Sequence, residues 1–371
     1  MLPVVIDART AVDHFPGIGR YVVNLASAMQ RVSPDLDLAL LRDPSAAARR
    51  LTLPGLPTFD CAASPFSLAQ QWRVRRVLQR VTAVLYHSPY YLMPYWPGVP
   101  AVFTCHDLIP LLYPQYFDPR QRLIFRFTHQ LALNSAQITI AVSHSTRHDL
   151  QRFFRVSPDR NVVIHEGVDG HFKPSSRAEL ERVRQYYALP ARYVLYFGSN
   201  KPHKNVPRLI EAFAKLGIRD QGIGIGLVIA GHWDERYPEA KQMVEQLNAK
   251  DIVRFIGPVK DDELPALYGG GEWFVYPSEY EGFGLPVLEA MACGVPVVCS
   301  NRSSLPEVAG DAALLCDPLD AAAIASALKR VLEDAALRFT LRQRALERAA
   351  QFTWERAAQL TKNAYQRALA G

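Results

Sequence analysis

The sequence predicts an α/β protein of two consecutive, doubly wound domains, each a parallel sheet covered by helices on both faces. Short β-rich strings alternate with helical patterns along the whole chain, which is typical of parallel strands joined by helical crossovers. The 371 residues also exceed what one hydrophobic core usually absorbs. A polar, helical segment at 170–190 separates two strand–helix series. We therefore predict a first domain over residues 1–172 and a second over 173–353.

The strands are predicted from short runs of apolar and β-branched residues. In the first domain these runs are 4–7, 36–41, 84–87, 101–105, 138–142 and 162–165. In the second domain they are 193–197, 226–230, 252–256, 273–276, 295–299 and 313–316. The last helix, about residues 354–371, is amphipathic, and it either closes the second domain or packs back on the first.

Composition excludes several classes of protein. The longest apolar runs fall far short of the roughly 18–20 residues that span a bilayer, and the N-terminus does not resemble a signal peptide. The five cysteines are scattered and form no CxxC pair, so we expect buried thiols rather than disulfides or a zinc site. The motifs GxxxxGK[ST], HExxH and GxSxG are absent. We expect a cytoplasmic protein without a membrane span.

The positive charge is concentrated in the first half of the chain. Residues 1–170 contain 17 arginines, no lysine and 12 acidic residues. Arginine without lysine is a poor match to a surface that coats nucleic acid, so we expect no nucleic-acid partner. An arginine-rich surface of this kind suits the binding of phosphate groups or of an anionic membrane. Segments 70–80 and 119–127 combine arginine with aromatic residues and could lie on an anionic bilayer, although their spacing is equally typical of covered helices.

The densest motif is YPSEYEGFGLPVLEAMACGVPVV at 276–298. A strand enters a loop that contains Glu281, and Pro286 marks the first turn of the next helix. Free N–H groups around Gly284 and Leu285 would form an anion site at the helix N-terminus. Glu289 follows Glu281 by eight residues, a spacing that suits a ligand with phosphate in the middle and hydroxyl groups at both ends. A capped helix with solvated acids is the alternative.

A second motif, FGSNKPHKNV at 197–206, follows the first strand of the second domain. Gly198 permits a tight turn, and Lys201 and Lys204 precede the helix predicted over 206–216. A lysine at such a helix entry suits a diphosphate, but exposed lysines are also common.

In the first domain, DHFPGIGRY at 13–21 places Gly17 and Gly19 after the first strand, with the helix entered through Arg20. Val22 occupies the position of the third glycine in GxGxxG, which disfavours nicotinamide binding. We predict a glycine loop that closes over phosphates, with a plain strand–helix turn as the alternative.

Polar residues follow two further strands of the first domain. His106 and Asp107 end the strand at 101–105, where a histidine could bond a sugar or assist proton transfer. Ser143 and Arg147 begin the helix after the strand at 138–142, and they suit an anionic acceptor, although capping alone explains the serine. Arg20 and Asp107 are further candidates for binding the acceptor.

These motifs resemble those of the retaining glycosyltransferases of family four, which have the GT-B architecture of two Rossmann-like domains facing across a cleft. The resemblance covers essentially the whole chain and is most specific in EGFGLPVLEAMACGVPVV, similar to the family's Glu-x7-Glu motif, and in the tail FTWERAAQL. The strings GIGRY, HDLIPLLYP and AVSHSTRHDL look most like bacterial mannosyltransferases that build surface polysaccharides.

The resemblance implies roles for individual residues. Glu281 would contact the hydroxyls of the donor sugar, and Glu289 the nucleotide ribose. Lys204 matches the phosphate-binding lysine, and His106 the histidine beside the transferred sugar. The backbone from Gly282 through Phe283 and Gly284 to Leu285 would meet the distal phosphate and sugar. Ser199 stands where many members have arginine, so the second positive charge would come from Lys201 or His203.

The expected activity is transfer of a hexose, with mannose from GDP-mannose as first choice, to a lipid-linked glycan acceptor with retention of configuration. Fixed N–H groups and lysine could stabilise the leaving diphosphate, so we expect no metal and no cofactor. GDP-rhamnose or a UDP- or dTDP-sugar is an alternative donor. A nucleotide-sugar epimerase and a non-catalytic module that binds sugar nucleotides are alternative functions. The expected location is the cytoplasm, with contact to the inner face of the cell membrane left open.

Overall fold

The computed structural model describes residues 3–12, 16–45, 53–217 and 224–370. The chain divides into two compact units. Unit 1 comprises Met1–Gly167 and Phe352–Gly371, and unit 2 comprises Val168–Gln351. The last helix therefore belongs to unit 1, because its apolar side packs in the core of that unit. The prediction that the two domains face across a cleft stays a prediction.

Unit 1 is built on a parallel seven-stranded sheet of order β3-β2-β1-β4-β5-β6-β7. Its strands are β1 (Val4–Asp7), β2 (Leu38–Arg42), β3 (Thr58–Asp60), β4 (Leu85–Ser88), β5 (Ala101–Cys105), β6 (Ile138–Ala141) and β7 (Asn161–Val163). Six of them match the predicted runs to within two or three residues. The short edge strand β3 was not predicted, because three residues give no pattern of their own.

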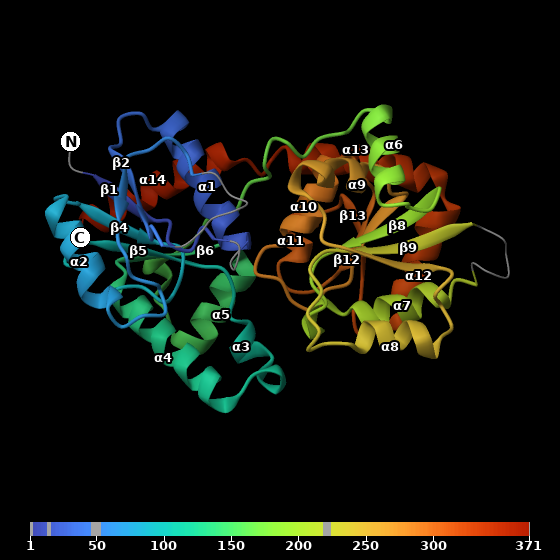
Figure 1. The fold of residues 1–371 in the computed structure, drawn as a ribbon, viewed down its shortest axis with the longest axis horizontal. Coiled ribbons are helices and arrows are strands. Elements are labelled where there is room, and N and C mark those ends of the chain that lie inside the picture. Colours follow the sequence, from blue (N-terminus) through green and yellow to red (C-terminus); the bar gives the residue numbers. More distant parts are fainter. Residues whose placement is uncertain (1–2, 13–15, 46–52, 218–223, 371) are drawn as a thin grey trace. The chain divides into compact units, whose positions relative to one another are not determined.

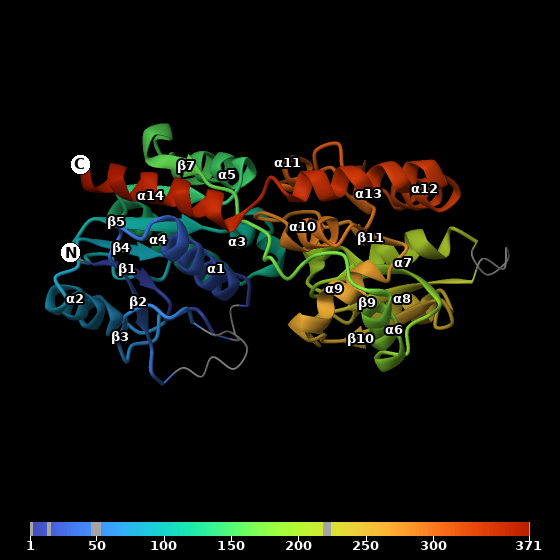
Figure 2. The same cartoon turned by 90° about the horizontal axis from the view of Figure 1, so that it is seen from above.

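Helices cover both faces of this sheet (Figures 1 and 2). They are α1 (Pro16–Val32), α2 (Gln70–Arg80), α3 (Ile109–Leu112), α4 (Pro119–Ser135), α5 (His144–Phe154) and α14 (Trp354–Ala370). Val4 and Ile6 point to the core shared with α1 and α14, whereas Val5 points to the core shared with α2, α4 and α5. This alternation follows from the two-residue period of a strand. The buried β1 is therefore apolar on both faces, as a central parallel strand requires.

Unit 2 has a parallel six-stranded sheet of order β10-β9-β8-β11-β12-β13. The strands are β8 (Arg192–Phe197), β9 (Ile225–Ala230), β10 (Val253–Gly257), β11 (Trp273–Tyr276), β12 (Val297–Ser300) and β13 (Ala313–Cys316). The helices are α6 (Arg177–Tyr186), α7 (Val206–Ala214), α8 (Glu239–Gln246), α9 (Leu264–Gly269), α10 (Leu285–Ala292), α11 (Leu305–Ala309), α12 (Ala321–Glu333) and α13 (Ala335–Ala349). Helices α7, α8 and α12 lie on one side of the sheet, and α6, α9, α10 and α13 on the other (Figure 1).

Two further predictions concern the chain as a whole. All five cysteines are buried and free of disulfides, which confirms their prediction as core thiols. Among the helices of the described residues, none is both long and apolar enough to cross a membrane.

Candidate functional site

The first cluster of polar residues lies at the carboxyl ends of β8 and β11, which are hydrogen-bonded neighbours at the centre of the unit 2 sheet. Lys204 ends a short 3-10 helix (Pro202–Lys204) after β8, and Glu281 lies in the loop after β11. The Lys204 Nζ atom donates to both Glu281 carboxylate oxygens, at 2.6 and 2.8 Å, and to the Tyr276 hydroxyl at 2.9 Å. The lysine and the glutamate that the sequence singles out separately thus form one ion pair.

This ion pair is largely shielded from water. The side chains of Lys204 and Glu281 are 16% and 11% exposed. Tyr276 is fully buried and stacks on Tyr196 at 5.7 Å between ring centroids. Burial, followed by the nearby Glu281 charge, raises the pKa of Tyr276 well above its ordinary value. The phenol therefore stays protonated, and the cluster holds one positive and one negative charge.

The loop that carries Glu281 is fixed by two serines after β12. Ser303 and Ser304 donate to the Glu281 carbonyl at 2.6 and 2.9 Å, and Ser304 also donates to the Phe283 carbonyl at 2.7 Å. Sequence reasoning missed these serines, although their place directly after a predicted strand was a usable signal. These hydrogen bonds fix the backbone from Glu281 through Gly282 to Phe283, and they thereby restrict the position of the Glu281 side chain.

Helix α10 starts immediately after this loop. Gly284 precedes it with φ at +110°, and a Cβ there would lie 2.7 Å from Leu305 Cδ2, so only glycine suits the position. The Val287 and Leu288 N–H groups bond to the Gly284 carbonyl, and in the described chain no side chain caps the helix. Because Pro286 has no N–H and the next two N–H groups are bonded within the turn, an anion at this helix start would rely on the Gly284 and Leu285 N–H groups, and the predicted anion site stays a prediction.

Glu289 lies in the second turn of α10 and is buried. Its carboxylate accepts a hydrogen bond from the Tyr268 hydroxyl at 2.9 Å. Burial and the Glu289 charge together raise the pKa of Tyr268 well above its ordinary value. Glu289 thus lies inside α10, whereas Glu281 lies in the loop before it, and the Glu289 carboxylate is paired with a protonated phenol.

The loop after β8 positions the other predicted donor-site residues. Gly198 and Ser199 are half-buried, and the Ser199 carbonyl accepts from the Tyr196 hydroxyl at 2.8 Å. Lys201 is exposed. His203 is buried, and burial together with Lys204 and Lys201 lowers its pKa well below the ordinary value. Burial and the two lysines thus disfavour a charged His203, so Lys201 is the better candidate for the predicted second positive charge.

A second cluster lies at the carboxyl ends of β5 and β7 in unit 1. The His106 Nδ1 atom lies 3.1 Å from a Glu166 carboxylate oxygen, and the Tyr21 ring meets the His106 ring edge-on at 5.0 Å. The Tyr21 hydroxyl bonds to Thr104, which also bonds to His87 Nε2 at 2.8 Å. Burial lowers the pKa of His87 to about 3. Glu166 was not predicted, since a lone acid 60 residues from His106 carries no local signal.

The glycine loop predicted before α1 is not a loop. Helix α1 already begins at Pro16, so Gly17, Gly19 and Arg20 lie in its first turns. The physical reason is that proline fixes a helical φ and suits the first helical position. Residues 13–15 of the same motif lie outside the described residues.

Two of the three remaining candidates of unit 1, Ser143 and Asp107, have local structural partners. Ser143 caps α5 by accepting from the Thr146 N–H at 3.0 Å, and Asp107 accepts from the Ile109 N–H at 3.1 Å. Arg147 lies in α5, and its Nε atom is buried without a partner among the described residues. Capping thus explains Ser143, whereas the Arg147 guanidinium retains a free donor.

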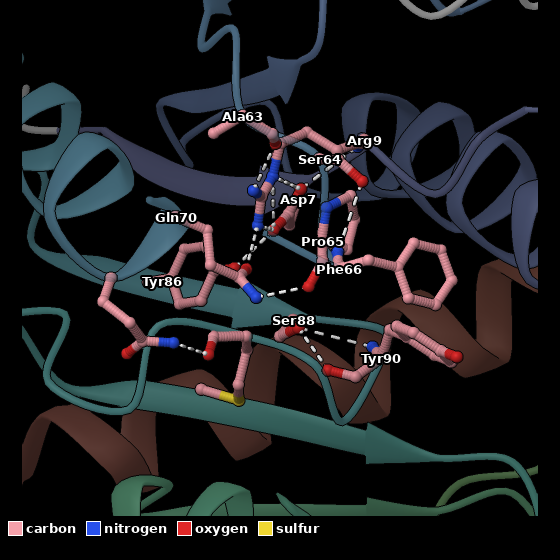
Figure 3. A network of polar contacts seen from close by, with 12 residues as sticks. Asp7, Arg9, Ala63, Ser64, Pro65, Phe66, Gln70, Tyr86, Ser88 and Tyr90 are labelled. Carbon is pink, nitrogen blue, oxygen red and sulfur yellow. Dashed lines mark hydrogen bonds and ion pairs between the residues drawn. The ribbon is translucent and has the colours of Figure 1, made fainter. Parts of the chain in front are cut away.

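A buried ion pair between Asp7, the last residue of β1, and Arg9 was not predicted from the sequence. Arg9 is fully buried and bonds the Asp7 carboxylate through both Nε and Nη2, the Ala63 carbonyl at 2.8 Å and Gln70 at 3.0 Å (Figure 3). The Tyr86 hydroxyl bonds to the same carboxylate. Every charged group here has an internal partner, so the cluster ties β1 and β4 to the segment before α2. In the described part of the chain, no group of three or more His, Cys, Asp or Glu side chains is placed to hold a metal ion.

Comparison with known proteins assigns the chain. Residues 16–171 match the family described as Glycosyltransferase Family 4, and residues 181–351 match Glycosyl transferases group 1. The O-antigen chain mannosyltransferase B of Escherichia coli is 38% identical over 76% of this chain and 74% of its own length. The chain belongs to the family 4 glycosyltransferases. The predicted glycosyltransferase activity and family resemblance are confirmed.

Other relatives of this glycosyltransferase are longer than the chain. The serotype-specific mannosyltransferase WbdA of Escherichia coli is 32% identical over 72% of this chain, which spans about a third (33%) of that protein. Among solved structures, sucrose-phosphate synthase from Thermosynechococcus elongatus superposes with a TM-score of 0.78 over all of both chains, at 24% identity. This likeness confirms the predicted GT-B class of two Rossmann-like domains.

Proposed function

We propose that this glycosyltransferase transfers mannose from GDP-mannose to a lipid-linked glycan during assembly of a bacterial surface polysaccharide. The names of the relatives, an O-antigen chain mannosyltransferase and a serotype-specific mannosyltransferase, support the sugar and the pathway. GDP-rhamnose and UDP- or dTDP-sugars are the competing donors.

The contact that carries this proposal is the one between Lys204 and Glu281. Lys204 and the first turn of α10 would hold the diphosphate, with Lys201 as a second cation. Glu281 would orient the sugar hydroxyls, and Glu289 would bind the ribose. His106 would contact the transferred sugar, and Arg147 an anionic part of the acceptor. Gly198, Ser199 and the backbone from Gly282 to Leu285 would line the donor site. For Gly17 and Gly19 we propose only that, because they lack a side chain, they let the donor approach the start of α1 closely.

Charge explains the reaction that such a site would catalyse. Breaking the anomeric C–O bond leaves an anionic nucleoside diphosphate and an oxocarbenium-like sugar. Lysine and helix N–H groups would stabilise the leaving group, and the departing phosphate oxygen would take the proton from the acceptor hydroxyl. Glu281 pairs with Lys204 and would bind the sugar hydroxyls, so we do not propose it as a nucleophile. The acceptor would therefore attack from the face that the diphosphate leaves, and configuration would be retained. The step would proceed without a metal ion.

A panel of nucleotide sugars, each with and without an acceptor glycan, tests this function. We expect GDP release from GDP-mannose only when acceptor is present, and unchanged turnover with a chelator. Loss of activity with chelator and its return with magnesium would contradict the metal-free step. An epimerised sugar without acceptor would identify an epimerase, and donor binding without turnover a binding module. Glu281→Ala should lower transfer at least ~100-fold, whereas Glu211→Ala on α7 serves as the control.

We further propose that unit 1 rests on the inner face of the cell membrane while the protein is otherwise cytoplasmic. Helices α2 and α4 carry four and three arginines and no acidic residue, and both cover the same face of the unit 1 sheet. Large apolar side chains stand exposed on them, with Trp72 at 62%, Leu123 at 69% and Phe127 at 61%. Arginine and exposed aromatic residues together suit an anionic bilayer, where each basic residue contributes about 1 kcal/mol.

Vesicle sedimentation tests this contact. We expect binding to phosphatidylglycerol vesicles at low salt and release at high salt, with little binding to phosphatidylcholine alone. Trp72→Ser and Phe127→Ser should weaken binding. Phe339→Ser, which changes an equally exposed ring in unit 2, should not. No sedimentation with anionic vesicles at low salt would end this proposal.

A further inference from the structure

His106, which is half-buried, and Glu166, which is buried, form a hydrogen-bonded pair at the carboxyl edge of the unit 1 sheet. His106 directly follows β5, and Glu166 lies three residues after β7. The Glu166 residue is 4% exposed, and within the described chain its one polar partner is His106 Nδ1, at 3.1 Å. A buried carboxylate is costly without a hydrogen-bond donor. The contact therefore favours a proton on Nδ1, pointing at Glu166.

The other ring nitrogen of His106 is left without a partner. Nε2 is buried and accepts or donates no hydrogen bond within the described residues. The ring is nevertheless held in place, because Tyr21 packs edge-on against it, at 89° between the planes, and Thr146 Oγ1 donates to the His106 carbonyl at 3.3 Å. An oriented ring with one unsatisfied nitrogen is unusual, since buried polar atoms in folded proteins are nearly always paired.

His87 in the same unit provides the contrast. Both of its ring nitrogens are bonded, Nδ1 to the Tyr365 hydroxyl at 2.7 Å and Nε2 to Thr104 Oγ1 at 2.8 Å. Its hydrogen bonds link β4, β5 and α14, which is what a structural histidine does. His106, by contrast, has one ring nitrogen without a hydrogen-bond partner among the described residues.

We infer that Glu166 is a positioning residue, which holds the Nδ1–H tautomer of His106 so that the Nε2 lone pair accepts a hydrogen bond from a hydroxyl of the carbohydrate substrate. The inference rests on the proposed function, in which His106 contacts the transferred sugar. Glu166 itself touches no substrate and acts through the ring. In a neutral imidazole one nitrogen donates and the other accepts, so fixing the first also fixes the second.

The tautomer is measured directly in the wild-type protein by 15N NMR with labelled histidine, at mildly alkaline pH. His106→Gln assigns the signals by their loss. We expect a protonated Nδ1 and an unprotonated Nε2. The opposite tautomer, or rapid exchange between the two, would overturn the inference. This measurement needs no Glu166 variant to fold and no substrate.

Kinetics then test whether Glu166 acts through His106. Glu166→Met keeps the size of the side chain and removes the acceptor. We expect kcat to fall about 10- to 100-fold through loss of ring orientation, with KM for the donor changed little. Glu166→Gln, whose amide carbonyl can still accept, should recover part of the activity. In a His106→Gln background Glu166→Met should cost nothing more. An equal loss in both backgrounds would overturn the inference, because the glutamate would then act independently of the ring.

A matched control and a separate readout complete the design. Glu355→Met changes an exposed glutamate of the same unit, paired with Arg31, and should leave activity unchanged. Full activity of His106→Gln would overturn the substrate role of Nε2. Failure of the proposed function is distinct from both results, since it would appear as a wild type that transfers no sugar from any donor, whatever tautomer NMR records.

Discussion

Replacing Lys204 with methionine breaks the ion pair at the centre of the unit 2 cluster. Methionine keeps the length of the apolar stem and removes the charge. Nζ lies 2.6 and 2.8 Å from the Glu281 oxygens, and the two side chains are 16% and 11% exposed. Removing one partner of a buried pair costs about 3–5 kcal/mol, because the other charge is left unpaired. The remaining exposure favours the lower end, about 3 kcal/mol. For a unit of this size, that lowers the melting temperature by roughly 6–12 °C.

The same substitution also removes the cation proposed to hold the leaving diphosphate. We therefore expect turnover to fall at least ~100-fold, equivalent to about 2.7 kcal/mol of transition-state stabilisation. Calorimetry of the full chain measures the first effect, and acceptor-dependent nucleotide release measures the second. The two assays separate a folded but inactive enzyme from an unfolded one.

Two variants make this prediction refutable. Lys215→Met changes an exposed lysine that pairs with Glu211 on α7, and it should alter stability by no more than about 0.5 kcal/mol. In Lys204→Met/Glu281→Gln no charge is left unpaired, so much of the lost stability should return while activity stays low. A Lys204→Met enzyme with near-normal turnover and melting temperature would show that the ion pair matters for neither stability nor catalysis.

Three more outcomes follow from the buried groups. Burial lowers the pKa values of His87 in β4 and His129 in α4 to about 3. Both histidines therefore bind protons more readily in the unfolded chain than in the folded one, so the free energy of unfolding falls as pH drops from about 6.5 toward 3. At pH 5 the loss is roughly 2 kcal/mol for each histidine. Urea unfolding at pH 7 and 5 measures this loss, which His129→Gln should reduce. Arg9→Met should destabilise unit 1 by about 3–5 kcal/mol, and an equal effect of Arg42→Met at an exposed pair would contradict the role of burial. Gly284→Ala should lower both stability and transfer because of its positive φ, and a donor KM equal to that of the wild type would disprove its place in the donor site.

Local sequence patterns predicted most of the fold. Parallel strands buried on both faces are continuous apolar runs, so the central strands were found at nearly their observed bounds. The three-residue β3 was missed, because it shows no periodicity and is defined by pairing with β2. The start of α1 was placed too late, since its two glycines suggested a loop and outweighed the helix-starting Pro16.

The candidate site was predicted in part. Glu281, Lys204 and His106 were chosen because they follow strands, and the carboxyl ends of parallel strands meet at one edge of a sheet. Their partners Tyr276, Ser303 and Glu166 were not chosen, because an ordinary tyrosine, serine or glutamate becomes informative only through what it contacts.

The sequence by itself determined the family, the α/β class and the residue types available to each loop, since these depend on motifs and on patterns of neighbouring residues repeated along the chain. Only the tertiary structure decided which charges meet. Lys204 and Glu281 are 77 residues apart, and His106 and Glu166 are 60 apart. Each pair forms because strand order brings two loops to the same sheet edge. Strand order depends on the burial of whole helical layers, which no short stretch of sequence encodes.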